Sequence, residues 1–308
     1  MPDLRVDLGK LSLKNPVLTA SGTFGYGLEY LPFGDLRRLG GLVVKGLSLE
    51  PRPGNPGPRI VETSSGLLNA IGLHNIGARA FLEDALPYLP WKETPVVVNL
   101  YGQSASEFEE LAELFADRPE VAALEVNISC PNVKAGGSQF GQDPKAAAEV
   151  CRAVRSRAGR TPVMVKLSPN VSDIREIALA AEDAGVDMLS LINTLSAMAV
   201  DIRTRRPRLG NVVGGLSGPA IKPVALRMVH AVCQSVSLPV VGIGGIVSAE
   251  DVLEFILVGA RAVQVGTANF IRPDASFRLV EELEALMAEL GLESLESFRG
   301  SLRLEEKP

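Results

Sequence analysis

The sequence predicts an α/β protein that folds as a closed (β/α)8 TIM barrel, with an N-terminal β-hairpin and irregular insertions over the barrel mouth. Short apolar runs rich in β-branched residues alternate with longer amphipathic segments, the pattern of βα units around a parallel sheet. Gly185 and Gly259 each stand between an expected helix and the next strand. Eight such units fit a barrel of about 250 residues, and an open doubly wound sheet is the alternative. We expect one domain over residues 1–308.

Eight apolar runs are interpreted as the barrel strands. They are Pro16–Ala20, Gly41–Lys45, Pro95–Leu100, Ala122–Ile128, Pro162–Leu167, Met188–Asn193, Pro239–Gly244 and Ala262–Gly266. The amphipathic segments between them are expected to be helices: Ser104–Ala116, Pro144–Arg157, Ser172–Ala184, Pro219–Val236 and Ala249–Val258. Ser172 with Asp173, and Ser248 with two acids after it, are typical of helix N-termini.

Two regions depart from this repeat. Residues 3–13 alternate polar and apolar side chains on both sides of Gly9, which predicts a hairpin of the kind that plugs the bottom of a barrel. Residues 47–77 form a long insertion rich in proline and glycine after the second strand, and we expect it to be irregular. Loops of that length are usually functional.

The composition excludes several classes of protein. Of the 308 residues, 46% are hydrophobic and 22% are charged, the balance of a globular chain rather than a disordered one. The formal net charge of −5 argues against nucleic-acid binding, which normally needs a clustered basic face. The longest uncharged stretch, Val229–Ala249, contains a histidine, a proline and three glycines and is not a membrane span.

Cysteine and histidine usage indicates a reducing compartment and no metal centre. Cys130, Cys151 and Cys233 are too few for a disulfide framework, and no pair has C-x-x-C spacing. His74 and His230 lie far apart in sequence, so we expect neither a zinc site nor an iron–sulfur cluster in this chain. The N-terminus is charged at once and shows no signal core. We therefore expect a cytoplasmic protein without membrane attachment.

In a barrel of this kind, function is located where the strands end. Lys45 and Lys166 each end an apolar strand, where a lysine needs an anion or an electron-rich ring, or loses its charge. A cation beside a flavin, a Schiff-base nucleophile and a side chain extended to the rim all fit that position. Gly244-Gly245 and Gly266-Thr267 follow the seventh and eighth strands, either as a phosphate site or as tight turns. A Rossmann site is disfavoured because the third glycine of G-x-G-x-x-G is missing.

Amides and one cysteine complete the set of candidate residues. Each asparagine offers a donor and an acceptor on one planar group, so several together suit a ring with imide and amide edges. Each alone is more often a turn residue. Cys130 begins a glycine-containing loop after a strand, whereas Cys151 and Cys233 lie on expected helix faces and are interpreted as inert. The asparagines are Asn69, Asn99, Asn127, Asn132 and Asn193.

Four motifs occur in order along the chain: Asn69-Ala70-Ile71-Gly72-Leu73, Asn127-Ile128-Ser129-Cys130-Pro131-Asn132, Val165-Lys166-Leu167-Ser168-Pro169-Asn170 and Gly214-Gly215-Leu216-Ser217-Gly218-Pro219-Ala220. Together they resemble the dihydroorotate dehydrogenase family, the flavin enzymes that oxidise dihydroorotate to orotate in pyrimidine biosynthesis. The resemblance runs from about Leu4 to Arg299. It implies a single FMN-binding barrel domain.

The resemblance also implies roles for individual residues. Cys130 would be the catalytic base and would mark a soluble class, since membrane-bound relatives use serine there. The residues expected to hold FMN are Ser21, Lys45, Gly46, Asn99, Asn127, Lys166, Ile192, Gly218, Gly244, Gly245, Gly266 and Thr267. Those expected to hold dihydroorotate or orotate are Lys45, Asn69, Ala70, Ile71, Gly72, Leu73, Asn127, Asn132, Asn193 and Thr194.

Two further segments, Leu191-Ile192-Asn193-Thr194 and Ala199-Val200-Asp201-Ile202, resemble the NAD-linked type B catalytic subunit. That type implies a homodimer within a heterotetramer, with FAD and an iron–sulfur cluster only in the electron-transfer partner. A stand-alone enzyme that reduces fumarate is the alternative within the family. A dihydropyrimidine dehydrogenase and a Schiff-base aldolase are the alternatives outside it.

Overall fold

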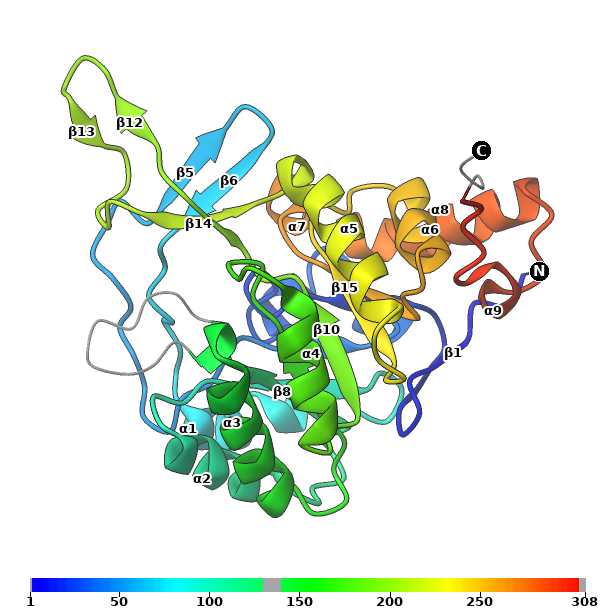
Figure 1. Cartoon of the computed structure of the whole chain (residues 1–308), viewed down its shortest axis with the longest axis horizontal. Helices are drawn as coiled ribbons and strands as arrows, with labels where there is room; N and C mark the ends of the chain where they lie inside the picture. The colour runs from blue at the N-terminus through cyan, green and yellow to red at the C-terminus, as the bar shows by residue number, and fades with distance from the viewer. Residues whose placement is uncertain (1, 130–139, 305–308) are drawn as a thin grey trace.

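Eight parallel strands form one sheet in the computed structural model, which describes residues 2–129 and 140–304 (Figure 1). All eight strands expected from the sequence are present. They are β3 (Val17–Thr19), β4 (Leu42–Val43), β7 (Val96–Leu100), β8 (Ala123–Asn127), β9 (Val163–Lys166), β10 (Met188–Leu191), β15 (Val240–Ile243) and β16 (Ala262–Val265). Their order in the sheet is β3-β16-β15-β10-β9-β8-β7-β4, so strands that follow one another in the chain are neighbours in space.

The sheet closes between its two outermost strands. Leu18 in β3 forms a parallel bridge with Gly41, just before β4. The buried Thr19 hydroxyl accepts a hydrogen bond from the Val43 N–H (2.9 Å) and donates one to the Val43 carbonyl (3.2 Å). The fold is therefore the predicted (β/α)8 barrel, and the open doubly wound alternative is wrong.

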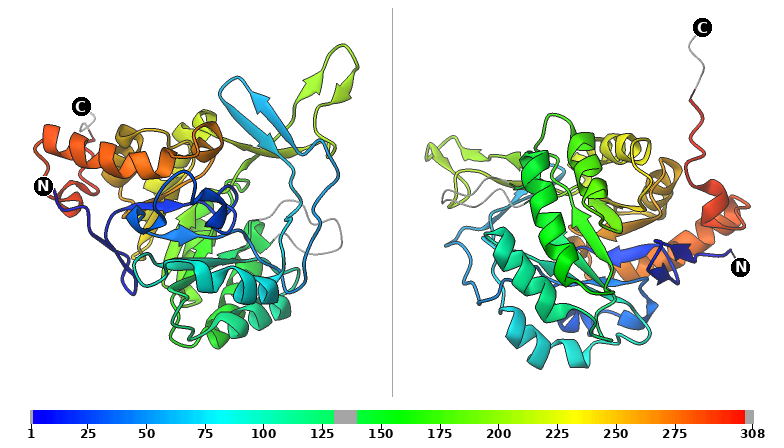
Figure 2. Two further views of the ribbon diagram at one scale, coloured as in Figure 1. Left: turned by 180° about the vertical axis from the view of Figure 1, so that it is seen from behind. Right: turned by 60° about the horizontal axis from the view of Figure 1, so that its bottom comes forward.

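Helices surround the barrel (Figures 1 and 2). They are α1 (Ala78–Asp84), α2 (Ala105–Phe115), α3 (Pro144–Arg157), α4 (Ile174–Asp183), α5 (Lys222–Cys233), α6 (Ala249–Leu257), α7 (Ala268–Ile271), α8 (Ala275–Glu289) and α9 (Leu295–Phe298). The five expected helices are α2 to α6. Asp173, rather than Ser172, caps α4, and Ser248 forms a capping box with Asp251 at α6. No helix within the described ranges is long and apolar enough to span a membrane.

The N-terminal hairpin closes the lower end of the barrel, as the sequence predicts. Its strands, β1 (Val6–Asp7) and β2 (Ser12–Leu13), pair antiparallel, and Gly9 turns between them with φ of 81°. Leu8, Leu11 and Leu13 are buried against one inward side chain from every barrel strand. Those eight are Leu18, Val43, Val97, Ala123, Met164, Met188, Val241 and Ala262. The barrel interior is thus apolar and sealed at this end.

A second sheet lies over the other end of the barrel, and here the prediction of an irregular insertion is only partly right. Residues 47–77 contain the hairpin β5 (Ile60–Thr63) and β6 (Gly66–Asn69). The chain after β10 supplies β11 (Leu195–Ala197) and β14 (Gly214–Ser217), giving the antiparallel order β11-β14-β6-β5. Two segments that lie far apart in the sequence therefore form one sheet, the cover sheet, over the mouth of the barrel.

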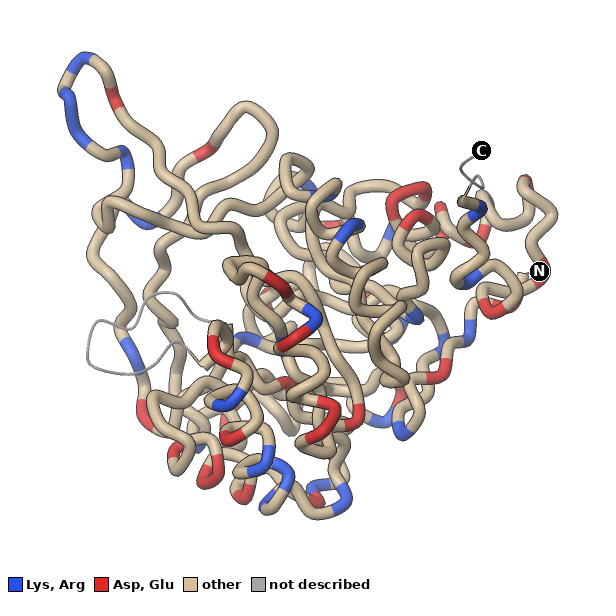
Figure 3. Tube along the Cα trace, viewed as in Figure 1, with Lys and Arg blue, Asp and Glu red and all other residues tan. Residues whose placement is uncertain are grey.

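A short projecting hairpin extends from this cover, formed by β12 (Val200–Asp201) and β13 (Arg206–Pro207) (Figure 1). Figure 3 shows basic residues concentrated along it, whereas residues of both signs of charge are interspersed over the helices. Its arginines are Arg203, Arg205, Arg206 and Arg208. Ile202, directly before the first of them, is 87% exposed. The hairpin presents a basic and partly apolar edge to solvent.

We predict that Leu8→Ala lowers the free energy of unfolding by about 2–5 kcal/mol, because it leaves a cavity among side chains that cannot fully collapse. Chemical denaturation followed by circular dichroism measures this loss. Leu179→Ala on α4 is the control, since Leu179 is 42% exposed and its truncation is expected to change stability by less than about 0.5 kcal/mol. Equal effects at the two positions would contradict a plug that stabilises the barrel.

Candidate functional site

A cavity of about 440 Å³ opens where the barrel strands end, within the size range of small-molecule sites. Strand-end loops, the β5–β6 hairpin, β14 and α7 surround it. The residues that the sequence predicts as ligand-binding and that line this cavity are Ser21, Lys45, Gly46, Asn69, Ile71, Gly72, Leu73, Asn99, Asn127, Lys166, Ile192, Asn193, Thr194, Gly218, Gly244, Gly245, Gly266 and Thr267. The predicted cofactor and substrate residues therefore converge on one place.

Three predicted residues do not appear in this lining. Ala70 is 1% exposed and packs with Leu68 and Leu209 in a small apolar cluster of the cover sheet. Cys130 and Asn132 fall between the two described ranges. The roles assigned to them from the sequence stay predictions.

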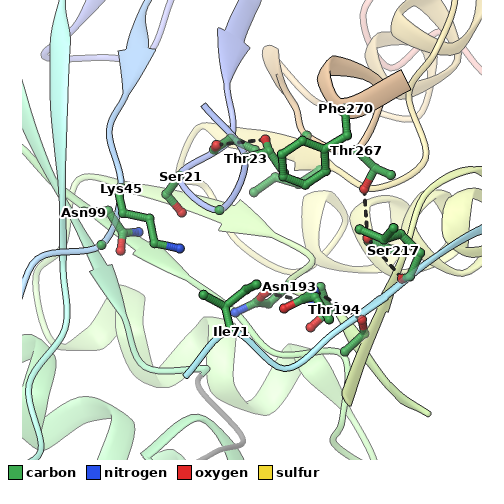
Figure 4. Close-up of a pocket in the computed structure, with 18 of the residues that line it drawn as sticks. Ser21, Thr23, Lys45, Ile71, Asn99, Asn193, Thr194, Ser217, Thr267 and Phe270 are labelled. Carbon is green, nitrogen blue, oxygen red and sulfur yellow. Dashed lines mark hydrogen bonds between the residues drawn. The ribbon is translucent and has the colours of Figure 1, made fainter. Parts of the chain in front are cut away.

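Two lysines bring positive charge to the cavity. Lys166, the last residue of β9, is 5% exposed, and its Nζ lies 3.4 Å from the Ser21 hydroxyl. Lys45 follows β4, and Figure 4 shows its amino group pointing into the cavity between Ser21 and Ile71. Cations in a partly buried site favour an anionic ligand or an electron-rich ring, because few water molecules screen their charge.

Three side chains at the ends of β8 and β10 form a hydrogen-bonded chain. The Asn193 amide donates to the Ser129 hydroxyl (2.6 Å), which in turn donates to Oδ1 of Asn127 (2.8 Å). Oδ1 of Asn193 accepts from the backbone N–H of Thr194 (2.8 Å). Because its oxygen is engaged, Asn127 offers a ligand mainly N–H donors. The network fixes the polarity of this side of the cavity.

The cover sheet approaches the strand ends closely at Gly215. A Cβ there would lie 2.0 Å from Oγ1 of Thr194, so only glycine fits. The Asn69 amide donates to the Gly215 carbonyl (3.2 Å). Asn170, from the third sequence motif, donates to the Thr194 carbonyl (3.0 Å) and accepts from the Ser196 N–H (2.9 Å). These contacts fasten the cover to the barrel beside the cavity.

Glycine loops form the opposite end of the cavity. Gly244 and Gly245 have φ of 129° and 76°, and a Cβ on Gly245 would lie 2.9 Å from the Gly218 carbonyl oxygen. The Thr267 hydroxyl donates to the Ser217 hydroxyl (2.8 Å), joining this corner to the cover (Figure 4). The backbone thus comes close enough for N–H groups to contact a phosphate directly.

Asp251 at the start of α6 holds the loop that follows Gly245. Its carboxylate accepts from the N–H groups of Val247 (2.7 Å) and Ser248 (2.9 Å) and from the Lys222 amine (2.5 Å). Burial disfavours the charge of Lys222, but hydrogen bonds to Asp251 and Glu254 outweigh burial and raise its pKa. The glycine loop therefore rests on a fixed ionic support.

A buried polar layer lies between this cavity and the apolar lower layer. Glu125 in β8 has no exposed surface and accepts hydrogen bonds from Asn99 Nδ2 (2.6 Å), the Ser190 hydroxyl (2.8 Å) and Gln264 Nε2 (2.5 Å). Of these, only Asn99 also lines the cavity. The layer is a set of side chains from four strands held by one carboxylate.

The sequence interpretation missed three residues of this region. Phe270, which the sequence analysis does not single out, is 49% exposed and lines the cavity. Ser217 appears in a motif but not among the predicted ligand contacts. Glu125 is a lone acid inside a buried apolar strand, and that contrast is a signal that could have identified it.

A family model described as dihydroorotate dehydrogenase matches residues 3–287. The chain belongs to the dihydroorotate dehydrogenase family. Membership favours the flavin interpretation of Lys45 and Lys166 over the Schiff-base interpretation.

Curated relatives extend over almost the whole chain. The chain is 67% identical over 302 residues to the "dihydroorotate dehydrogenase B (NAD(+)), catalytic subunit" of Solidesulfovibrio magneticus, covering 98% of this chain and 99% of the relative. It is 60% identical over 302 residues to the protein of that name from Maridesulfovibrio salexigens, with the same coverage. For the Geobacter sulfurreducens protein of that name, identity is 56% over 303 residues, again 98% and 99% of the two chains.

The cavity fits the FMN that this family implies. Oδ1 of Asn99 is buried beside the cavity and bonds to no described group, so it awaits a donor. A Cβ at Gly46 would lie 2.7 Å from that oxygen, so any larger residue there would crowd it. The glycine loops suit a phosphate and the two lysines an electron-rich ring. Fixed donors, an acceptor and cations thus match the parts of the cofactor.

Of the two cysteines outside the predicted site, Cys151 is buried and Cys233 is half-buried. Cys151 on α3 has no exposed surface, and burial raises its pKa to about 12. Cys233 ends α5, and burial raises its pKa to about 12 as well. No group of histidines, cysteines or acids in the described ranges could hold a metal ion.

We predict that in the folded Cys130→Ala variant the thiols of Cys151 and Cys233 react slowly with iodoacetamide at pH 8. At that pH a thiol with a pKa of about 12 is ionised in only about one molecule in ten thousand, and the thiolate is the nucleophile. Their reactivity is expected to rise with pH towards 12. Mass spectrometry counts the adducts, and rapid labelling at pH 8 without unfolding would contradict the raised pKa of these thiols. Denatured protein is the control.

Proposed function

We propose that this chain is the one-domain catalytic subunit of an NAD-linked dihydroorotate dehydrogenase, which binds FMN and oxidises dihydroorotate to orotate. The observation that carries this proposal is the meeting of two lysines, several amides and two glycine loops in one cavity of a chain from this family. The names of the three relatives agree with it.

The substrate is expected to bind between the strand ends and the cover sheet. Dihydroorotate carries a carboxylate and a ring with imide and amide edges. Lys45 would pair with negative charge, and Asn127 and Asn193 would donate to ring oxygens. Asn69, Thr194 and the segment 71–73, which belong to the cover or adjoin it, would hold the remaining edge. Burial in this cavity makes each bond selective, because an unmatched polar edge would be left unpaired.

The cofactor would occupy the barrel side of the cavity. Ser21, Lys166 and Asn99 would contact the ring, and the loops of Gly244, Gly245, Gly266 and Thr267 the phosphate. When bound, FMN supplies the acceptor for the hydride that leaves carbon 6 of the substrate. Lys166 would stabilise negative charge on the ring.

The proton balance of the oxidation requires a base. We assign it to Cys130, which would take the proton from carbon 5 as the hydride leaves carbon 6. An unperturbed thiol has a pKa of about 8.5, so its thiolate fraction rises through the neutral to alkaline range.

The electrons are expected to leave through another polypeptide. We infer a cytoplasmic homodimer within a heterotetramer, whose partner subunit carries FAD and an iron–sulfur cluster. The support is the "catalytic subunit" and "NAD(+)" in the relatives' names, together with the type B segments around residues 191–202. The second candidate is a stand-alone enzyme of the same family that passes its electrons to fumarate.

Cys130→Ala is predicted to retain FMN but to oxidise dihydroorotate at least about 10²-fold more slowly, because only the proton acceptor is removed. Absorbance of bound flavin and dye-linked turnover measure the two properties. Cys130→Ser is expected to keep weak activity that increases with pH. Near wild-type turnover of Cys130→Ala would show that the base is another group.

Asn193→Ala is predicted to weaken orotate binding by about 1–3 kcal/mol while changing FMN affinity much less, because a buried polar edge of the ligand loses its partner. Titration calorimetry with orotate on the FMN-loaded chain measures the difference. Asn15→Ala is the matched control, since Asn15 bonds to Arg38 and Val17 away from the cavity. Loss of orotate affinity in both variants would indicate general destabilisation instead.

The purified chain is predicted to be yellow, to release FMN on denaturation and to reduce an artificial dye with dihydroorotate. NAD⁺ reduction is expected only after the partner subunit is added, because the chain has no nucleotide fingerprint of its own for NAD. Assays with dye, NAD⁺ and fumarate, with and without the partner, test this. Rapid fumarate reduction by the chain alone would contradict the NAD-linked type but not membership of the family.

A further inference from the structure

The buried carboxylate of Glu125 controls the orientation of Asn99. Glu125 lies at the centre of the barrel with no exposed surface, and its three hydrogen bonds come from three different strands. Both carboxylate oxygens of Glu125 accept hydrogen bonds, so Glu125 pairs with the nitrogen end of the Asn99 amide. Nδ2 of Asn99 therefore faces Glu125 at 2.6 Å, and Oδ1 remains for the cavity.

Oδ1 of Asn99 can accept a hydrogen bond from a ligand in the cavity. Asn99 has no exposed surface, and its Oδ1 bonds to no group in the described part of the chain. Gly46, which lines the cavity, has its missing Cβ position 2.7 Å from this oxygen. A buried acceptor without a donor costs free energy, and a ligand N–H or O–H would remove that cost.

Burying the carboxyl group of Glu125 in the barrel core costs desolvation free energy. Within residues 2–129 and 140–304 it forms no ion pair within 4.0 Å, so three neutral donors alone compensate its burial. A glutamine at this position would satisfy a barrel core equally well, but it could pair with either end of the Asn99 amide. Only an acceptor-only group fixes the amide in one orientation.

We propose that Glu125 is a positioning residue for the cofactor: it holds Asn99 with its carboxamide oxygen presented to the cavity, as the acceptor for an N–H or O–H donor of FMN. This inference rests on the proposed function, because it assumes that FMN is the ligand. It adds a residue that does not touch the cavity to the group that determines cofactor affinity.

A double-mutant cycle on the full-length chain tests the proposal. FMN affinity is measured by flavin fluorescence for the wild type, Glu125→Gln, Asn99→Ala and the double variant. We expect each single substitution to raise the Kd by about tenfold, and the double variant to lie within about twofold of Asn99→Ala. The reduction potential of bound FMN is measured in the same proteins and should show the same dependence on Asn99, which a loss of barrel stability alone would not produce.

Ser190→Ala is the matched control. Ser190 donates to the same carboxylate but does not line the cavity, so its truncation should change the Kd by less than about threefold. Thermal melting of the FMN-free proteins checks that each variant folds. If Glu125→Gln does not fold, Glu125→Asp takes its place, because it keeps a carboxyl group but withdraws it from Asn99.

Failure of the positioning role and failure of the proposed function give different results. Independent, additive effects of Glu125→Gln and Asn99→Ala, an unchanged Kd in either one, or an equal effect of Ser190→Ala would overturn the positioning role. A wild-type chain that binds no FMN would overturn the proposed function and this inference with it.

Discussion

Every second residue of each barrel strand points inward, and the rest of the structure depends on how those positions are filled. Near the amino ends, one apolar side chain per strand meets the leucines of the N-terminal hairpin. Two residues farther along, Asn99, Glu125 and Gln264 bury polar groups that bond to one another. The dry layer below excludes water from these bonds, which makes them stronger and their geometry more fixed. The next positions open into the cavity.

The barrel could be predicted from the sequence because each strand is a local apolar pattern, and strand ends locate a site without further information. The cover sheet could not, because β6 and β14 are only four residues long, contain three glycines between them and pair residues about 150 positions apart. Glu125 shows the same limit: its function depends on three partners from other strands. Ala70 shows a third limit. A motif identifies a segment near the ligand but does not tell which of its side chains line the cavity.

The two sides of the cavity have different origins. Ser21, Asn99 and Lys166 stand on or beside barrel strands, where neighbouring strands restrain them. Asn69 and the segment 71–73 belong to an excursion that the barrel does not need for its own closure. Such a division lets one side be retained while the other varies, since excursions tolerate change better than core strands.

The pairing of β3 with β16 joins residues 17–19 to residues 263–265. During synthesis β3 leaves the ribosome early and lacks this neighbour until nearly the whole chain has emerged. Closure of the ring therefore comes last, and the cavity becomes complete at the same moment. A chain that stops short of β16 keeps two open sheet edges, which are templates for association with other unfinished chains. Such a fragment is a hazard to its neighbours and a substrate for proteolysis, not a weaker version of the enzyme.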